Sequence, residues 1–529
     1  MPMPEAPPAP LGRRRSERIG ASSGRVRFAL ALGAGGLAGL GQVPFSLVPV
    51  SLLGFALACL ALLSAPSLGA AAVAGWAVGA GYFAITLFWI VEPFFVDAAR
   101  HAWMAPFALV FLAGGLALFW GAAFAAARLL APGDERRQAL AFAVTLTLAE
   151  LARSYVLTGF PWALPGYVWT ETTPRGWAAV VGPHGLSFLT LGLAALVALV
   201  LAAPPRPMAW RRLAAAAVGF ALFLGAGPLF LPAPGPGGDG RPIVRLVQPN
   251  APQHEKWDPD KAVGFVRRQI DFTGAPAAPG QARPDLIVWP ETAIPYLLEQ
   301  ADPVLRDIAA AAGDAPVVIG VQRRAAELAY NALAVIGAGG AISAIYDKHH
   351  LVPFGEYIPL GQLSTLVGMR SYAARDGYGY SPGPGPQLLD LGRLGVALPL
   401  ICYEAIFPQD LAGAPGRADF LLQITNDAWF GEFSGPYQHL AQARMRAVEQ
   451  NLPMVRVANT GVSAMIDPAG RVLAEIPLGQ AGWIDVALPA GGAPTIYVRT
   501  GDWAALAGLL GLLALLAATR GMARARNRH

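Results

Sequence analysis

Charged residues are scarce in this sequence. Asp, Glu, Lys and Arg make up 14% of its 529 residues, whereas hydrophobic residues make up 54%. Soluble proteins carry about 25% charged residues, so this composition excludes an ordinary soluble chain and predicts a membrane protein. The 39 Lys and Arg residues outnumber the 34 Asp and Glu residues, but the arginines gather at the ends of apolar runs. This placement argues against nucleic-acid binding and indicates a role in membrane topology.

Cysteine is almost absent as well. The chain has only Cys59, inside an apolar run, and Cys402, far away in the polar half. Two distant thiols exclude a disulfide framework and a thiol metal cluster. His349 and His350 are adjacent, but no third ligand stands at a diagnostic spacing, so we expect neither a metal nor another cofactor.

Long apolar runs fill the first half of the chain. Each can supply the ~20 residues that cross a bilayer as a helix. Seven spans are predicted near 28–45, 46–64, 68–91, 104–128, 137–156, 179–203 and 212–231, and an eighth at 503–519. The fold class is therefore a polytopic α-helical membrane protein with about eight transmembrane helices. The boundary between the first two spans is marked by little more than the break at residues 41–44.

Arginines predict the orientation of the spans. They lie before the first span, between the fourth and fifth, between the sixth and seventh, and after the eighth. By the positive-inside rule these segments, including both termini, face the cytoplasm. A cleaved signal peptide is the alternative for the first span, but apolar spans continue after it, which favours a retained helix.

Two charged residues lie inside the fifth span. Glu150 and Arg153 are three residues apart and share one face of a helix. Isolated charges are costly in a bilayer, so we predict an internal ion pair in preference to a lipid-headgroup contact.

Between the last two spans the composition changes to that of an α/β domain. Strands are predicted at 243–247, 286–289, 317–321, 332–336, 341–346, 396–401, 420–424, 454–457 and 463–466, and helices at 258–273, 303–312 and 438–450. The domain plan is a basic cytoplasmic arm at 1–27, a transmembrane domain at 28–231, a linker at 232–240, the α/β domain at 241–489, a final transmembrane region at 490–519 and a basic tail at 520–529. Seven spans that start inside leave the α/β domain on the outer side.

Reactive side chains follow three of these strands. Glu291, Lys348 and Cys402 each come shortly after a strand ends, and strand ends can meet at one edge of a sheet. A carboxylate can take a thiol proton, the thiolate can attack a carbonyl, and an ammonium can stabilise the resulting oxyanion. We also expect the lysine to draw the thiol pKa below its free value of ~8.5. Taken singly, each residue has a structural explanation, and only their joint occurrence indicates catalysis.

The segments that contain these three residues resemble the three catalytic motifs of the nitrilase superfamily. Their sequences resemble the form that these motifs take in its membrane branch, the apolipoprotein N-acyltransferase family. These segments are WPETAIP at 289–295, YDKHHLVPFGEYIP at 346–359 and ICYE at 401–404. Other similar segments are 158–162, 248–250, 330–331 and 426–430. Residues 248–250 are Gln-Pro-Asn, where Gln-Gly-Asn is expected.

The resemblance implies an extracytoplasmic α-β-β-α sandwich with Glu291 as general base, Lys348 as oxyanion stabiliser and Cys402 as nucleophile. It also implies supporting roles for four residues and a substrate contact for a fifth. The four supporting residues are Glu356, Tyr403, Glu404 and Asn331, and the residue implied to contact substrate is Trp257. For Asn331 and Trp257 simple packing remains an alternative.

The implied reaction moves the sn-1 acyl chain of a phospholipid, typically phosphatidylethanolamine, through a cysteine thioester by a ping-pong mechanism. The acceptor is the α-amino group of the diacylglyceryl-cysteine of an apolipoprotein, and the reaction completes lipoprotein maturation at the periplasmic face of the bacterial inner membrane. The alternatives are a membrane-tethered amidase that uses water and a non-catalytic lipoprotein-binding scaffold. Segments 360–371 and 372–386 predict either a mobile lid or a disordered surface loop.

Overall fold

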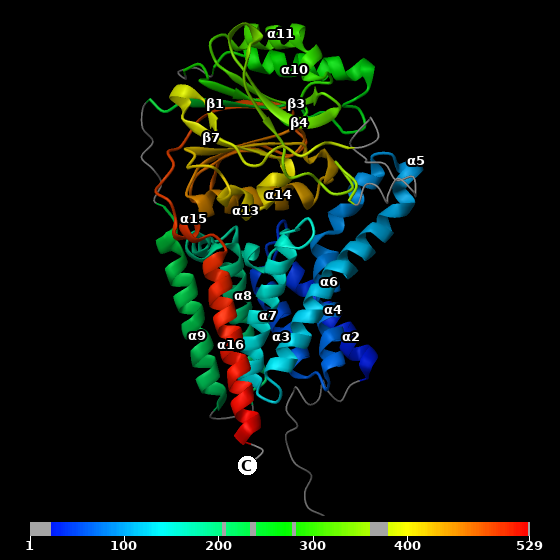
Figure 1. Ribbon diagram of the computed structural model, residues 1–529, viewed down its shortest axis with the longest axis vertical. Coiled ribbons are helices and arrows are strands. Elements are labelled where there is room, and N and C mark those ends of the chain that lie inside the picture. The colour runs from blue at the N-terminus through cyan, green and yellow to red at the C-terminus, as the bar shows by residue number, and fades with distance from the viewer. Residues whose placement is uncertain (1–22, 204–207, 233–239, 278–281, 360–378, 527–529) are drawn as a thin grey trace, which may run out of the picture.

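The protein consists of a helical bundle with an α/β sandwich stacked on one end (Figure 1). The computed structural model describes residues 23–203, 208–232, 240–277, 282–359 and 379–526. The last helix runs from the sandwich to the far end of the bundle, where the chain ends. The bulk of the predicted lid, 360–378, lies outside the described residues.

Within the described residues a long helix lies at each predicted span. These helices are α2 (Gly24–Gly39), α3 (Val48–Leu63), α4 (Leu68–Thr86), α6 (Ala105–Leu130), α7 (Glu135–Tyr155), α8 (Ala178–Leu201), α9 (Met208–Ala226) and α16 (Trp503–Arg526). Among the described residues, five helical stretches are long and apolar enough to cross a membrane, judged by length and composition: 68–86, 98–130, 173–201, 210–230 and 503–520. The first helix is displaced from the prediction, because residues 40–47 turn and separate α2 from α3.

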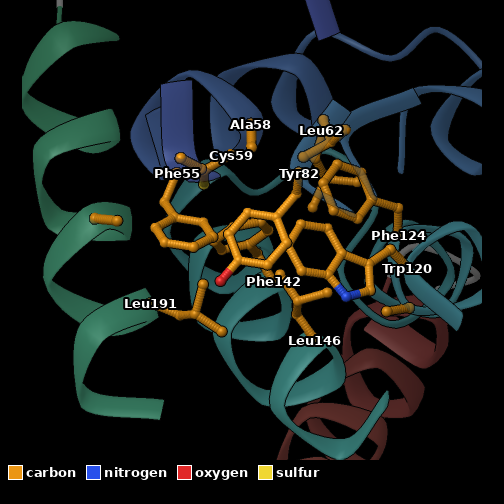
Figure 2. Close-up of a cluster of buried hydrophobic side chains, with 14 of the residues drawn as sticks. Phe55, Ala58, Cys59, Leu62, Tyr82, Trp120, Phe124, Phe142, Leu146 and Leu191 are labelled. Carbon is orange, nitrogen blue, oxygen red and sulfur yellow. The ribbon is translucent and has the colours of Figure 1, made fainter. Parts of the chain in front are cut away.

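Aromatic side chains and glycines pack the bundle. Figure 2 shows Phe55, Tyr82 and Trp120 in contact at its centre, with Cys59 in the same cluster. The Tyr82 and Trp120 rings are stacked with their centroids 4.9 Å apart. A Cβ added at Gly81 would lie 2.0 Å from the Leu32 carbonyl oxygen, so only glycine lets α2 and α4 approach this closely.

The predicted ion pair in α7 is confirmed. Glu150 and Arg153 are both buried, and Arg153 Nε donates to Glu150 Oε1 at 3.0 Å. The guanidinium also donates to the main-chain carbonyls of Phe160 and Trp162. Trp162 Nε1 in turn donates to Gln438 Oε1 of the sandwich at 2.7 Å. The pair therefore holds the turn after α7, and Trp162 in this turn links the bundle to the sandwich by its hydrogen bond to Gln438.

Two six-stranded sheets form the sandwich. The first, in the order β12-β1-β2-β3-β4-β5, contains β1 (Ile243–Gln248), β2 (Leu286–Val288), β3 (Val317–Ala325), β4 (Leu328–Ile336), β5 (Ile342–Asp347) and β12 (Gly482–Ala487). The second, in the order β11-β10-β9-β8-β7-β6, contains β6 (Leu389–Asp390), β7 (Val396–Ile401), β8 (Phe420–Thr425), β9 (Met454–Ala458), β10 (Ser463–Ile466) and β11 (Val472–Ile476). The central neighbours pair in parallel, β1 with β2 and β7 with β8.

Helices cover both outer faces of the sandwich. In Figure 1, α10 (Pro259–Gly274) and α11 (Asp302–Ala312) lie on the first sheet, farthest from the bundle. The helices α13 (Pro408–Ala412) and α14 (Gly435–Gln450) lie between the second sheet and the bundle. The α-β-β-α arrangement is therefore confirmed.

The nine predicted strands are all present, but three others were missed. The missed strands are β6, β11 and β12. β6 has only two residues, while β11 and β12 carry partly exposed side chains and so lack a continuous apolar run. The apolar signal detects buried strands and is weak at the edges of a sheet: of the four edge strands in these two sheets it found β5 and missed the other three.

Candidate active site

Three strand ends bring the predicted triad together. Glu291 follows β2, Lys348 follows β5 and Cys402 follows β7. All three side chains are buried, and Lys348 Nζ lies 3.5 Å from Glu291 Oε1. The charges of Glu291 and Lys348 both act on the Cys402 thiol. The first sheet thus supplies the carboxylate and the ammonium, and the second sheet supplies the thiol.

Donors on both oxygens orient the Glu291 carboxylate. Asn331 Nδ2 donates to Oε1 at 2.7 Å, and the Asn426 main-chain N–H donates to Oε2 at 2.9 Å. A general base must be held within reach of the proton that it accepts. These two contacts, one from each sheet, hold the carboxylate in one orientation.

Lys348 lies between two carboxylates. Its Nζ donates to Glu356 Oε1 at 2.9 Å, and Glu291 Oε1 lies 3.5 Å away. Burial disfavours the charged form, but Glu356 and Glu291 outweigh burial and raise the pKa of Lys348. The lysine therefore stays positively charged at neutral pH, as an oxyanion stabiliser must.

Asn331 joins the same two carboxylates from a different direction. Its Nδ2 donates to Glu356 Oε1 at 2.9 Å as well as to Glu291, and its main-chain carbonyl accepts from the Lys348 N–H at 2.9 Å. The Glu356 carboxylate also accepts from the Val352 N–H at 2.8 Å. The structure thus brings two of the four predicted supporting residues, Glu356 and Asn331, into direct contact with Glu291 and Lys348.

Cys402 occupies an unusual backbone conformation. Its φ is +51°, where a residue other than glycine is uncommon, and it begins the 3₁₀ helix η10 (Cys402–Ile406). Its carbonyl oxygen accepts from Gln423 Nε2 at 3.3 Å and lies 3.1 Å from His439 Nε2. Sharp, strained turns of this kind cluster at functional sites.

The expected pKa of the thiol was wrong in direction. Burial, followed by the negative charge of Glu291, raises the pKa of Cys402, and the opposing effect of Lys348 is smaller. The prediction counted the nearby ammonium and left out the burial of the thiol itself, which is the larger effect. The raised pKa favours the protonated thiol, and a buried thiol of this kind can act as a nucleophile only if a base takes its proton.

A buried polar network supports the backbone of Cys402. His439 Nδ1 lies 2.8 Å from Asp427 Oδ1, and Arg456 Nη2 donates to Asp427 Oδ2 at 2.6 Å. Arg456 Nη1 donates to Gln423 Oε1 at 2.6 Å. Burial and then Arg456 lower the pKa of His439, which favours a neutral imidazole. This network was not predicted from the sequence, because its members come from different elements. Segment 426–430, which contains Asp427 and resembles the family, was the one indication of it in the sequence.

Glu404 and Tyr403 stabilise the turn at Cys402. Glu404 is fully buried; its Oε2 accepts from the Ile401 N–H at 2.7 Å, and its Oε1 accepts from the Tyr346 hydroxyl at 2.9 Å. The Tyr403 hydroxyl lies 3.5 Å from the Gly159 carbonyl oxygen, in the turn after α7. Through these contacts both residues hold the turn at Cys402 in position.

The adjacent histidines take part in contacts around the same turn. His349 Nδ1 lies 2.6 Å from Glu404 Oε1, and His350 Nδ1 lies 2.8 Å from Asp410 Oδ2. His350 Nε2 lies 3.1 Å from the Thr158 carbonyl oxygen. These partners are carboxylates and a main-chain carbonyl of the protein itself. The two histidines therefore connect the turn at Cys402 to the bundle.

Trp257 lies at the edge of the site. Its side chain is partly exposed and lines a cavity of about 10 Å³, room for about one water molecule. The preceding residue, Lys256, is buried and donates to the Glu291 main-chain carbonyl at 3.1 Å. Lys256 was not among the predicted site residues, although it directly precedes Trp257 in the sequence.

Comparison with known proteins gives two family matches and many similar full-length proteins. The carbon-nitrogen hydrolase family matches residues 244–496, and the apolipoprotein N-acyltransferase N-terminal domain matches residues 34–196. The apolipoprotein N-acyltransferase of Rhodopseudomonas palustris is 39% identical over 523 residues, which cover 93% of this chain and 95% of that protein. The protein of the same name from Bradyrhizobium diazoefficiens is 39% identical over 522 residues, which cover 95% of this chain and 96% of that protein.

Solved structures match about half of this chain. A CN-hydrolase superfamily protein from Xanthomonas campestris is 20% identical with a TM-score of 0.34, and the match covers 51% of this chain and 97% of that one. A carbon-nitrogen hydrolase from Helicobacter pylori is 13% identical with a TM-score of 0.35, and the match covers 46% of this chain and 88% of that one.

Proposed function

The chain belongs to the apolipoprotein N-acyltransferase family, and we propose that it transfers an acyl chain from phospholipid to lipoprotein through a thioester on Cys402. The chain is a bacterial membrane enzyme that N-acylates lipoproteins, with phospholipid and lipoprotein as substrates. In the proposed mechanism Glu291 is the general base and Lys348 stabilises the oxyanion. The observation that supports it most is the buried ammonium of Lys348, held between two carboxylates beside a buried thiol.

The first half-reaction acylates the thiol. Cys402 Sγ attacks the sn-1 ester carbonyl of a phospholipid while Glu291 takes the thiol proton. The carbonyl oxygen becomes an oxyanion, and the Lys348 ammonium stabilises it. When the C–O bond breaks, Glu291 returns the proton to the departing oxygen. Lysophospholipid leaves and the thioester remains. We propose phosphatidylethanolamine as the typical donor.

The second half-reaction transfers the acyl group to the lipoprotein. The α-amino group of the diacylglyceryl-cysteine attacks the thioester as a neutral amine, and Glu291 accepts the proton that the amine loses. The oxyanion forms again beside Lys348. The C–S bond breaks, the sulfur recovers its proton from Glu291, and the amide product leaves. The same three residues therefore serve both half-reactions.

Five other residues receive supporting roles in this proposal. Glu356 keeps Lys348 charged and, together with Asn331, keeps it oriented towards Glu291. Tyr403 and Glu404 hold the turn that carries Cys402, as their buried contacts indicate. Trp257 contacts substrate at the margin of the site.

Phospholipid supplied without acceptor tests the thioester. We expect the purified enzyme in detergent to release one equivalent of lysophospholipid in a burst and to accumulate a hydroxylamine-sensitive acyl adduct on Cys402, because the first half-reaction needs no acceptor. Mass spectrometry of the peptide that contains Cys402 and the burst amplitude are the measurements. A Cys402→Ala variant should give neither signal. Intersecting double-reciprocal plots without any adduct would rule out the ping-pong mechanism.

Reporter fusions test the membrane topology. We propose eight crossings, with both termini in the cytoplasm and residues 241–489 in the periplasm, because arginines follow the positive-inside pattern. A phosphatase fused at Gly237 should be active, since it would be periplasmic, and one fused at the C-terminus should be inactive. Fluorescent-protein fusions at the same two positions are the reciprocal control. Cytoplasmic fluorescence from the Gly237 fusion would contradict the span count.

A further inference from the structure

Lysine is rare in this chain, and its few members are unevenly placed. The sequence contains three lysines, Lys256, Lys261 and Lys348. Lys261 is on the surface and pairs with Glu255 at 2.7 Å, with 48% of its side chain exposed. Lys256 and Lys348 are both buried and both contact Glu291. The proposed mechanism gives a role to Lys348 but none to Lys256.

Lys256 contacts the main chain of Glu291 and the next side chain. Its Nζ donates to the Glu291 carbonyl oxygen at 3.1 Å and to Thr292 Oγ1 at 2.8 Å. Both acceptors are neutral oxygens. A buried ammonium without a hydrogen-bonded carboxylate costs free energy. Burial accordingly lowers the pKa of Lys256 to about 8, and the charges of Glu291 and Cys402 oppose this shift. A buried group with this cost needs a structural or functional reason.

The turn that Lys256 contacts is strained. Thr292 has a φ of +47°, and a β-branched residue in that region is a conformational outlier. The opposite side of the turn is tightly packed, since a Cβ added at Gly320 would lie 2.5 Å from Glu291 Cα. The Gly320 N–H donates to the Pro290 carbonyl at 3.1 Å. The turn is therefore bounded by β3 on one side and by Lys256 on the other.

We propose that Lys256 is a positioning residue that holds the Glu291–Thr292 turn and thereby aims the Glu291 carboxylate at Cys402. This inference rests on the proposed function, in which Glu291 is the base. The two buried lysines hold Glu291 at opposite ends: Lys348 contacts its carboxylate and Lys256 contacts its main-chain carbonyl. Lys256 bonds to the main chain beyond the reacting groups, so its removal should slow the chemistry more than it weakens substrate binding.

The first test compares Lys256→Met with Lys261→Met in a Cys59→Ala background, where Cys402 is the sole thiol. At saturating phospholipid, Lys256→Met should lower the single-turnover rate of lysophospholipid release by about 10–100-fold, since small misplacements of a catalytic group have effects of this size. Its KM should stay near that of the parent. Lys261→Met makes the same change on the surface and should keep the parent rate.

Thr292→Val provides a milder version of the same test. It keeps the β-branched shape and leaves Lys256 in place, but removes the hydroxyl that Lys256 contacts. Loss of one hydrogen bond predicts a rate about 2–10-fold lower, in the same direction as Lys256→Met. Thermal unfolding of every variant shows whether the protein is folded. If Lys256→Met fails to fold, Thr292→Val decides: a parental rate overturns the inference.

The pH profile of Cys402 alkylation by iodoacetamide separates positioning from packing. In the parent, a well-placed Glu291 assists loss of the thiol proton at neutral pH. In Lys256→Met this assistance is weakened, so alkylation should depend more on solvent hydroxide, and its deficit relative to the parent should shrink as pH rises. A constant deficit at all pH values would indicate a packing role and overturn the inference.

Glu291→Gln in the same assays distinguishes the inference from the proposed function beneath it. A parental rate of release in Glu291→Gln would overturn the assignment of Glu291 as base, and with it the premise for Lys256. A slow Glu291→Gln together with parental rates in Lys256→Met would leave the proposed function standing and overturn the inference alone. We expect both variants to be slow, with Glu291→Gln the slower.

Discussion

Replacing Cys402 with serine is expected to abolish acyl transfer while the protein stays folded. A serine hydroxyl is far less acidic than a thiol, and a carboxylate such as Glu291 is too weak a base to activate it. Loss of a catalytic nucleophile predicts a fall in kcat of more than about 10⁴. Serine is close to cysteine in size and can occupy the same turn, so unfolding should occur near the parental temperature.

Acyl transfer from labelled phospholipid to a lipopeptide acceptor, followed over hours, is the measurement. The other cysteine provides the matched control. Cys59 is fully buried in the bundle, among the aromatic side chains of Figure 2, and lies outside the catalytic turn. Cys59→Ala should therefore transfer at the parental rate. Turnover by Cys402→Ser close to that of the parent would remove Cys402 from the role of nucleophile.

Replacing Lys348 with alanine should have the second largest effect and should slow both half-reactions. An oxyanion forms in each, and losing one preorganised donor typically costs on the order of 10²–10³ in rate. Stability should fall as well, because Glu291 and Glu356 would then lie close together in a buried site without their shared cation. Removing one member of a buried ion pair costs about 3–5 kcal/mol of unfolding free energy.

The two half-reactions are measured separately for this variant. Release of lysophospholipid reports acylation, and decay of an isolated acyl-enzyme on addition of lipopeptide reports transfer. Lys261→Ala, which removes an exposed lysine, is the control and should leave both rates near those of the parent. If Lys348→Ala slowed acylation but not transfer, the ammonium could not be the stabiliser of both oxyanions.

Patterns that are local in sequence predicted much of the fold. Continuous apolar runs identified β7 and β8, which are buried on both faces, and apolar length identified the helices of the bundle. The same reasoning missed β11 and β12, whose side chains are partly exposed, and displaced the ends of α2. Local pattern reports burial of a segment and says little about edges and turns.

The candidate site shows the same division. Glu291, Lys348 and Cys402 were identified because each follows a strand and lies in a motif that the sequence shows. The network of Asp427, His439 and Arg456 was missed, because His439 lies inside a helix and Arg456 inside a strand, outside the similar motifs, so that only their contacts in the folded chain connect them.

By itself, the sequence determined the order of apolar spans and strands, and which strand ends carry reactive groups, because these are properties of neighbouring residues. Only the tertiary structure decided how the reactive groups behave. The pKa of Cys402 rises because the whole sandwich buries it, although the nearby lysine alone predicted a lower value. Lys256 reaches Glu291 because β1 and β2 are parallel neighbours, which brings the loops that follow them together. How far a single side chain is removed from water, and which distant segments it contacts, depend on all the surrounding elements at once, and no local pattern contains that information.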